Sequence, residues 1–230
     1  MKTTKFYLAK IPVIIWSVES DKVFIYVHGK MSNKESAKLF ASIAQSRGYQ
    51  TISFDLPEHG ERKDENYRCD VFNGISDLKQ ISAYALANWK TVSLYACSLG
   101  AYFSLQAYKD CIFEKCFFLA PIVDMEYLIK NMFKWFDITE EILNTEREIS
   151  TPIDILTWDY YQYVKNNPIV RWSSPTYILY GGKDNLQPFS VIKNFVKSTH
   201  AKLTISKHSE HSFMNNGDDE VIKKWLDKNL

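Results

Sequence analysis

Long hydrophobic runs are missing from this sequence. No segment approaches the roughly 18 consecutive apolar residues that a membrane-spanning helix needs. Lys2, Lys5 and Lys10 precede an apolar run at residues 11–16, but that run is short, contains Pro12 and is not followed by a small-residue cleavage pattern. We therefore expect neither a membrane span nor a signal peptide.

An excess of one charge is also missing. The chain carries 28 basic and 27 acidic residues, which gives a net charge of +1, and the basic residues form no stripe along the sequence. Nucleic acids and anionic membranes attract proteins with concentrated positive charge, so neither is an expected partner. A small neutral substrate suits this balance better.

Cysteine is scarce, and its spacing excludes a disulfide framework. Cys69, Cys97, Cys111 and Cys116 are irregularly placed and include no C-x-x-C pair. This pattern predicts reduced thiols in a cytoplasmic protein. With 230 residues, of which 46% are hydrophobic, the chain is long enough for one α/β domain over residues 1–230.

Apolar β-runs alternate with helical patterns over most of the chain. A buried strand at residues 23–27 precedes the capping-box pattern Ser32-x-x-Glu35, which predicts a helix that ends near Gly48. Such alternation predicts a doubly wound, mostly parallel sheet of the α/β class. We expect an opening antiparallel pair at residues 6–8 and 13–16, further strands at 50–54, 91–95, 116–119, 176–180 and 202–206, and further helices at 75–89, 99–109, 189–198 and 218–228.

Residues 124–174 interrupt this alternation. They contain no clear β-run and many aromatic residues on three or four predicted helices, and the pattern T-P-x-D at residues 151–154 is typical of a helix start. Aromatic rows on helices usually pack in a core. This segment, however, leaves and re-enters the sheet at one edge. We therefore expect a helical cap inserted in the domain, in which Trp135 and Phe136 contact substrate.

Residues 91–102 have the pattern of a strand that turns directly into a helix. The apolar spacing changes from that of a strand to that of a helix between Ala96 and Gly100. The residue at such a corner, here Ser98, is held in a strained conformation, and the positions two before and two after it must be small. Residues 96–100, A-C-S-L-G, match G-x-S-x-G with alanine in place of the first glycine. Ser98 is therefore a candidate nucleophile, unless it only caps the helix.

Two other polar residues, like Ser98, follow the carboxyl ends of predicted strands. They are Asp184 and His211, and open α/β sheets bind their ligands at this edge. A serine needs an imidazole to accept its proton, and the imidazole needs a carboxylate to fix its tautomer. The chain order serine, aspartate, histidine is the order described for the α/β-hydrolase fold.

Five short runs together resemble the α/β-hydrolase superfamily, near its small serine carboxylesterases. The resemblance extends from residue 23 to the C-terminus, and only the aromatic insertion has no motif of its own. It implies the α/β-hydrolase fold with a helical cap. The runs are Val27-His28-Gly29, Asp55-Leu-Pro-Glu-His59-Gly60, Ala96-Cys-Ser98-Leu-Gly100, Tyr180-Gly-Gly-Lys-Asp184 and Glu210-His211-Ser-Phe213.

The resemblance implies a serine hydrolase in which Ser98 is the nucleophile, His211 the general base and Asp184 the acid of the triad. Such an enzyme would cleave a carboxylic ester of a small apolar substrate through an acyl-enzyme. Thioester or peptide cleavage uses the same machinery, and a ligand-binding relative without useful turnover is an alternative of another class. The resemblance implies no cofactor.

The resemblance also implies an oxyanion hole. The backbone N–H groups of Lys30 and Leu99 would stabilise the oxyanion, with Met31 as an alternative donor. Met31, Trp135 and Phe136 are the expected substrate contacts.

Several of these residues have simpler explanations. Asp184 could only cap a turn. Asp124 also follows a strand and could be the triad acid instead, although helix capping explains it more simply. His208 lies three residues before the histidine of the triad, but no carboxylate motif accompanies the pair, so we do not expect a metal site. His28 and His59 are expected to hold loops by hydrogen bonds.

Overall fold

The computed structural model describes all 230 residues and contains one eight-stranded sheet, ordered β1-β2-β4-β3-β5-β6-β9-β10. Every strand pair is parallel except the two made by β2, which is antiparallel to β1 and to β4. The predicted mostly parallel α/β sheet is therefore confirmed. The strands are β1 (Thr3–Leu8), β2 (Ile11–Trp16), β3 (Lys22–Val27), β4 (Gln50–Phe54), β5 (Thr91–Cys97), β6 (Cys116–Leu119), β9 (Thr176–Gly181) and β10 (Lys202–Ser206).

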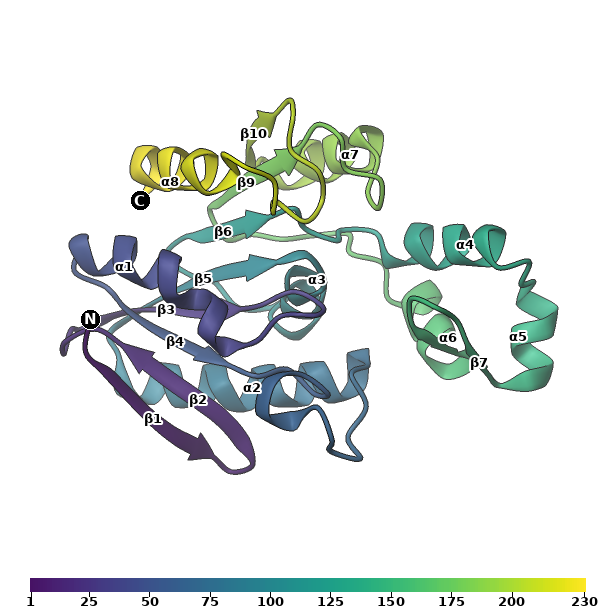
Figure 1. Cartoon of the computed structure of the whole chain (residues 1–230), viewed down its shortest axis with the longest axis horizontal. Coiled ribbons are helices and arrows are strands. Elements are labelled where there is room, and N and C mark those ends of the chain that lie inside the picture. Colours follow the sequence, from purple (N-terminus) through teal and green to yellow (C-terminus); the bar gives the residue numbers. More distant parts are fainter.

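Helices cover both faces of this sheet (Figure 1). Side chains alternate along β3. Phe24 and Tyr26 belong to the apolar cluster that includes residues of α1 and α8, whereas Val23 and Ile25 belong to the cluster on the other face, which includes residues of α2, α3 and α7. None of the helices combines the length and apolarity that crossing a membrane requires. The helices around the sheet are η1 (Lys34–Ala37), α1 (Lys38–Ser46), η2 (Gly60–Arg62), α2 (Val71–Asn88), α3 (Ser98–Ala107), α7 (Phe189–Thr199) and α8 (Asp218–Asn229).

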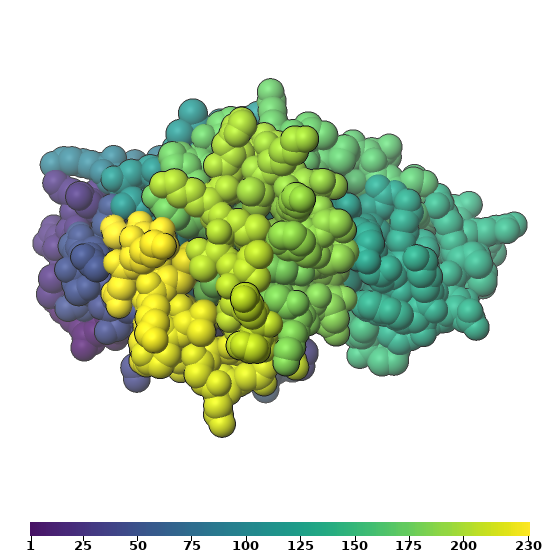
Figure 2. All heavy atoms as spheres, turned by 90° about the horizontal axis from the view of Figure 1, so that it is seen from above, coloured from purple at the N-terminus to yellow at the C-terminus, as the bar shows by residue number.

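The segment between β6 and β9 forms a cap beyond the carboxyl ends of the parallel strands. In Figure 1 it lies to the right of the sheet, and in Figure 2 it makes one end of the elongated molecule. Its helices α4 and α6 pack through aromatic contacts, such as that between the rings of Phe133 and Tyr161, whose centroids are 5.1 Å apart. The cap contains α4 (Met125–Trp135), α5 (Glu140–Glu146), β7 (Glu148–Ser150), β8 (Ile155–Thr157) and α6 (Trp158–Asn166).

The helix start predicted at residues 151–154 is wrong. These residues form the turn between the antiparallel strands β7 and β8, where the Thr151 hydroxyl accepts hydrogen bonds from the N–H groups of Ile153 and Asp154. The helix begins instead at Trp158, with Thr157 as its N-cap. Threonine can support either structure, because its hydroxyl accepts nearby N–H groups in turns as well as at helix ends.

The capping box predicted at Ser32 is also wrong by one residue. Asn33 is the N-cap of η1, and its side chain accepts the N–H of Glu35. The N–H of Lys34 donates to the distant carboxylate of Asp55, 2.8 Å away. This long-range hydrogen bond supplies the partner that a local cap would otherwise provide, and it fixes where the helix starts.

Candidate active site

The chain turns sharply where β5 meets α3. Ser98 has a φ of 45°, in the left-handed region that non-glycine residues rarely adopt. A methyl group on Gly100 would lie 2.3 Å from the carbonyl oxygen of His28, so only glycine fits there without a shift of β3. Ala96, on the other side of the corner, is completely buried. Close packing of strand and helix thus holds Ser98 at the tip of the turn.

Ser98 lies at the beginning of a chain of hydrogen bonds. Its Oγ is 2.7 Å from Nε2 of His211, and Nδ1 of His211 is 2.7 Å from Oδ2 of Asp184. If Nδ1 carries the proton and donates to the buried carboxylate, Nε2 is left to accept the proton of the Ser98 hydroxyl. The structure therefore brings together all three residues proposed for the triad, in the orientation that proton transfer from Ser98 needs.

Asp184 uses its two oxygens for different purposes. Oδ2 contacts His211, while Oδ1 accepts the N–H groups of Leu186 at 2.8 Å and Gln187 at 3.0 Å. The turn-capping explanation for Asp184 is therefore correct, but it does not compete with the contact to His211. These bonds fix the carboxylate rigidly below the imidazole. Asp124, the alternative acid, caps α4 by accepting the N–H of Tyr127.

Two backbone N–H groups near Ser98 are available to a ligand. Lys30 N–H donates no hydrogen bond within the protein, and Leu99 lies in the first turn of α3, where helix donors lack intrahelical partners. The loop before Lys30 lies against the nucleophile, because a methyl group on Gly29 would be 3.2 Å from Cβ of Ser98. The N–H of Met31 donates to Nε2 of His59 at 3.0 Å, so this residue is not an alternative oxyanion donor.

Two histidines hold the loops beside this site in the same way. His28 Nε2 accepts the N–H of Leu56 and His59 Nε2 accepts the N–H of Met31, each at 3.0 Å, so each ring links its own loop to the other loop. Nδ1 of each ring contacts a nearby backbone carbonyl, of Gly29 and Pro57 respectively. Burial lowers the pKa of His28 to about 4, which keeps the ring neutral and able to accept.

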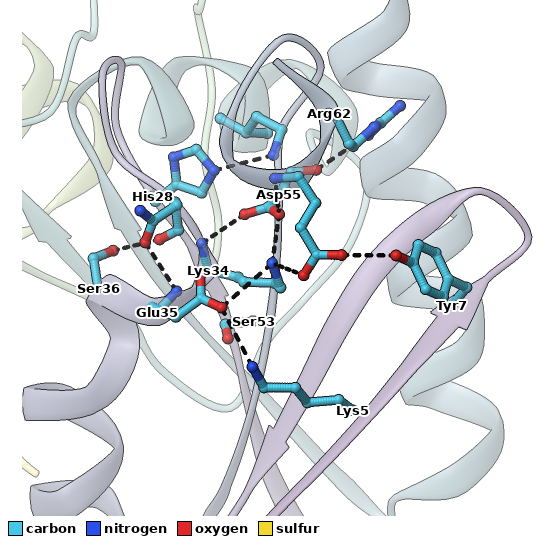
Figure 3. A network of polar contacts seen from close by, with 12 residues as sticks. Lys5, Tyr7, His28, Lys34, Glu35, Ser36, Ser53, Asp55 and Arg62 are labelled. Atoms are coloured by element: carbon cyan, nitrogen blue, oxygen red, sulfur yellow. Dashed lines mark hydrogen bonds and ion pairs between the residues drawn. The ribbon is translucent and has the colours of Figure 1, made fainter. Parts of the chain in front are cut away.

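A buried ion pair stabilises the loop that carries His59 (Figure 3). The carboxylate of Asp55 accepts hydrogen bonds from Nζ of Lys34 at 2.7 Å and from the N–H groups of Lys34 and Glu61. Lys34 is almost completely buried, and its Nζ also lies 2.7 Å from Glu61, which accepts the hydroxyl of Tyr7. Sequence reasoning did not identify Lys34, since a lysine is rarely buried and nothing local indicates its partner.

An apolar cavity of about 110 Å³ opens beside Ser98. Lys30 and Leu99 border it on the side of the sheet, and the cap closes the other side. Fourteen of its 18 wall residues are hydrophobic, and they include Met125, Leu128, Ile129, Met132 and Trp135 of α4, Ile155 and Leu156 of β8, and Tyr160 and Tyr161 of α6. A larger groove of about 430 Å³ lies between α4, α6 and α7, but it contains none of the three proposed triad residues.

One of the three expected substrate contacts lines this cavity. Trp135 is in its wall, whereas Phe136 and Met31 are not. Phe136 is the C-cap residue of α4, and one residue further along a helix changes the direction of a side chain by about 100°. The side chain of Met31 is 93% exposed to solvent.

Two ion pairs link the cap hairpin to the loops around the sheet. Lys30 pairs with Asp154, in the turn between β7 and β8, and both residues line the cavity. Arg68 pairs with Glu148 of β7, with an N–O distance of 2.7 Å. The hairpin is therefore held over the cavity by charged contacts on partly exposed side chains. No group of three His, Cys, Asp or Glu side chains has the arrangement of a metal site.

Comparisons with known proteins identify the fold. No family model and no curated protein sequence matches the chain. Solved structures do match over nearly the whole length. Est1E from Butyrivibrio proteoclasticus, solved with ferulic acid bound, has a TM-score of 0.78 at 15% identity, with 98% of this chain and 96% of that chain covered.

Two further structures resemble the chain. Alpha/beta hydrolase domain-containing protein 10 from mouse has a TM-score of 0.78 at 15% identity, with 99% of this chain and 98% of that chain covered. The thioesterase domain from the curacin biosynthetic pathway has a TM-score of 0.65 at 11% identity, with 98% of each chain covered. Together with the sheet order and the corner at Ser98, these matches show that the chain has the α/β-hydrolase fold.

Proposed function

We propose that this protein is a serine hydrolase that cleaves a carboxylic ester of a small neutral substrate. The observation that carries this proposal is the chain of hydrogen bonds from Asp184 through His211 to Ser98, and Ser98 borders an apolar cavity. A nucleophile, a base and a carboxylate in this geometry suit acyl transfer.

In the proposed mechanism, Nε2 of His211 takes the proton of Ser98 while Oγ attacks the carbonyl carbon of the ester. The N–H groups of Lys30 and Leu99 stabilise the negative charge that develops on the carbonyl oxygen. Asp184 stabilises the resulting imidazolium, which then gives its proton to the departing alcohol. Water, activated by the same histidine, hydrolyses the acyl-enzyme and restores Ser98.

The substrate class follows from the cavity and from charge. The cavity wall is mainly hydrophobic, and its one cation, Lys30, is paired with Asp154. An ionised group would therefore lose its hydration in this cavity without gaining an oppositely charged partner. A neutral apolar group does not carry this energetic penalty. Est1E, which has the same fold, was solved with ferulic acid bound, which supports a small organic molecule as the substrate. A thioesterase domain shares the fold as well, so thioesters are the alternative substrates.

We also propose a reducing, cytoplasmic location. All four cysteines are free thiols, and burial raises the pKa of Cys97 to about 12, which makes this neighbour of Ser98 unreactive.

A fluorophosphonate probe tests the proposed nucleophile. We expect a single label on the native protein, at Ser98, and none on Ser98→Ala, which should lose at least about 10⁴-fold in kcat on p-nitrophenyl esters. Ser212→Ala is the matched control, because Ser212 is an exposed serine next to His211, and it should keep both labelling and activity. A label that remains on Ser98→Ala would reject the proposal. Faster cleavage of acyl thioesters than of matched esters would favour a thioesterase.

A further inference from the structure

One buried side chain links the loop of the triad acid to the beginning of the cap. Gln187 follows Asp184 by three residues, between β9 and α7, and it is completely buried. Its Oε1 accepts the N–H groups of Val123 at 3.1 Å and Asp124 at 2.9 Å, where the chain passes from β6 into α4. Its Nε2 donates to the carbonyl oxygens of Asp124 at 3.0 Å and Leu186 at 3.1 Å. The amide thus uses every hydrogen bond that it can form.

The backbone of Gln187 is fixed as well. Its N–H donates to Oδ1 of Asp184 at 3.0 Å, and its carbonyl oxygen accepts the hydroxyl of Tyr180 at 3.0 Å. The carboxylate that contacts His211 is therefore held by the same residue whose side chain holds the beginning of the cap. A displacement of either part would break buried hydrogen bonds that no water is placed to replace, which is costly.

Helix α4 starts directly after this contact and supplies five residues of the cavity wall. Asp124 is the N-cap of the helix, and Leu186 lines the same cavity. The wall residues of α4 are Met125, Leu128, Ile129, Met132 and Trp135. Because a short helix moves as one rigid element, the hydrogen bonds at its start set where all five side chains lie relative to Ser98.

The other connection of the cap is held by a different glutamine. Gln106, in α3, donates from Nε2 to the carbonyl of Asn167 at 2.8 Å, just after α6. Its Oε1 accepts the hydroxyl of Tyr163 at 3.3 Å. Both connections of the cap are thus held by buried amides, but of the two glutamines only Gln187 also holds the triad acid.

We propose that Gln187 is a positioning residue, which fixes α4 and the triad carboxylate relative to each other, so that the cavity forms beside an aligned triad. This inference rests on the proposed hydrolase function and adds the way in which the cap and the triad act together. A displacement of α4 is transmitted to Asp184 through one amide. Since a misplacement of about 1 Å in a catalytic group can cost about 100-fold in rate, the side chain of Gln187 affects kcat as well as substrate binding.

Gln187→Met tests the proposal, because methionine removes the amide and keeps the length of the side chain. We expect kcat on p-nitrophenyl butanoate to fall about 10- to 100-fold, since Asp184 is no longer held against His211. Gln106→Met is the matched control, because it removes a buried amide that holds the cap alone. Its KM should rise while its kcat stays within about threefold of the wild type, as expected when only binding is weakened.

A spectroscopic measurement shows whether the effect passes through Asp184. The proton between Nδ1 of His211 and this carboxylate gives a strongly downfield proton NMR signal while the charge-assisted hydrogen bond is intact. The signal should be lost or moved upfield in Gln187→Met and unchanged in Gln106→Met. A role in stability alone would lower the melting temperature of Gln187→Met and leave both the signal and kcat unchanged. That result, or equal changes in the two variants, would overturn the proposal.

Amide hydrogen exchange tests the same link in the native protein, where no variant has to fold. The N–H groups of Val123 and Asp124 should open with the same free energy as those of Leu186 and Gln187, at every urea concentration, because one amide joins the two segments. Different opening free energies would overturn the proposal. Neither this measurement nor the NMR signal depends on turnover. If no ester is cleaved and Ser98 is not labelled, the hydrolase proposal fails, and these two measurements still decide whether Gln187 joins the cap to the carboxylate.

Discussion

Acidification should destabilise this protein through His28. The ring is completely buried, and its Nε2 accepts the N–H of Leu56. A proton on Nε2 would place two N–H groups face to face and would bury a charge. Burial accordingly lowers the pKa of His28 from 6.5 to about 4. Between these two values the unfolded chain binds a proton that the folded protein does not, so the free energy of unfolding falls as the pH falls.

The size of this effect follows from the shift in pKa. One pKa unit corresponds to about 1.4 kcal/mol, so His28 should cost about 2 kcal/mol of stability by pH 5 and about 3 kcal/mol by pH 4, relative to pH 7.5. Other groups near His28 also carry charge or titrate. The ring centroids of His28 and His59 are 5.2 Å apart, and the charges of Asp55 and Lys34 act on His28 as well. Their contributions have to be removed by comparison with a variant.

Urea unfolding from pH 7.5 to pH 4 measures the effect in the wild type and in His28→Gln. Glutamine can accept the N–H of Leu56 but does not titrate. The wild type should be the more stable protein at pH 7.5, and its advantage should shrink by about 3 kcal/mol at pH 4, since carboxylate effects are common to both proteins. His59→Gln is the control for the second ring. A difference between wild type and His28→Gln that is constant with pH would refute this reasoning.

Three further predictions concern the cap and the corner at Ser98. Asp154→Asn should change the free energy of unfolding by less than about 1 kcal/mol, because its ion pair with Lys30 is partly exposed. The same substitution should accelerate proteolytic cleavage of the turn between β7 and β8. Wild-type protein in about 0.5 M salt should be cleaved there as fast as Asp154→Asn, because salt screens the ion pair. Trp135→Ala enlarges the cavity, so the variant should prefer longer acyl chains than the wild type does. Each methylene added beyond the length that the wild type prefers should raise the kcat/KM of the variant about fourfold, whereas Phe136→Ala should leave the chain-length profile unchanged. Gly100→Ala should lower stability by about 1–3 kcal/mol and reduce fluorophosphonate labelling, because the added methyl would meet the carbonyl of His28 at 2.3 Å; calorimetry and labelling rates check both.

Elements defined by local pattern could be predicted from the sequence. Strand β3 is a continuous apolar run, and the corner at Ser98 follows from a change of period together with small residues at two positions. Ser98, Asp184 and His211 could be placed near one another without a structure, because the parallel strands β5, β9 and β10 end at the same edge of the sheet.

Features that depend on distant contacts could not be predicted. The pattern at Ser32 indicates a capping box, but the carboxylate of Asp55 takes the N–H of Lys34 and moves the helix start by one residue. Strands β7 and β8 have three residues each, which is too short for an alternating pattern to be recognised. The aromatic content of the cap does not distinguish Trp135, in the cavity wall, from Phe136, outside it.

The backbone N–H of Lys30 is free because the polar backbone groups on either side of it already have partners. Three consecutive residues, Gly29, Lys30 and Met31, follow β3 at the edge where Ser98 lies. The carbonyl of Gly29, which belongs to the same peptide group as the N–H of Lys30, contacts His28, and His59 takes the N–H of Met31 in the next peptide group. Both peptide groups are therefore held by rings, of which His28 is linked to the opposite loop through the N–H of Leu56. The N–H of Lys30 is left unpaired within a rigid loop, which is what stabilisation of a transient oxyanion requires, since a flexible donor would have to reorganise during the reaction. In this protein the two histidines would therefore contribute to catalysis by accepting hydrogen bonds from backbone groups, without transferring a proton themselves.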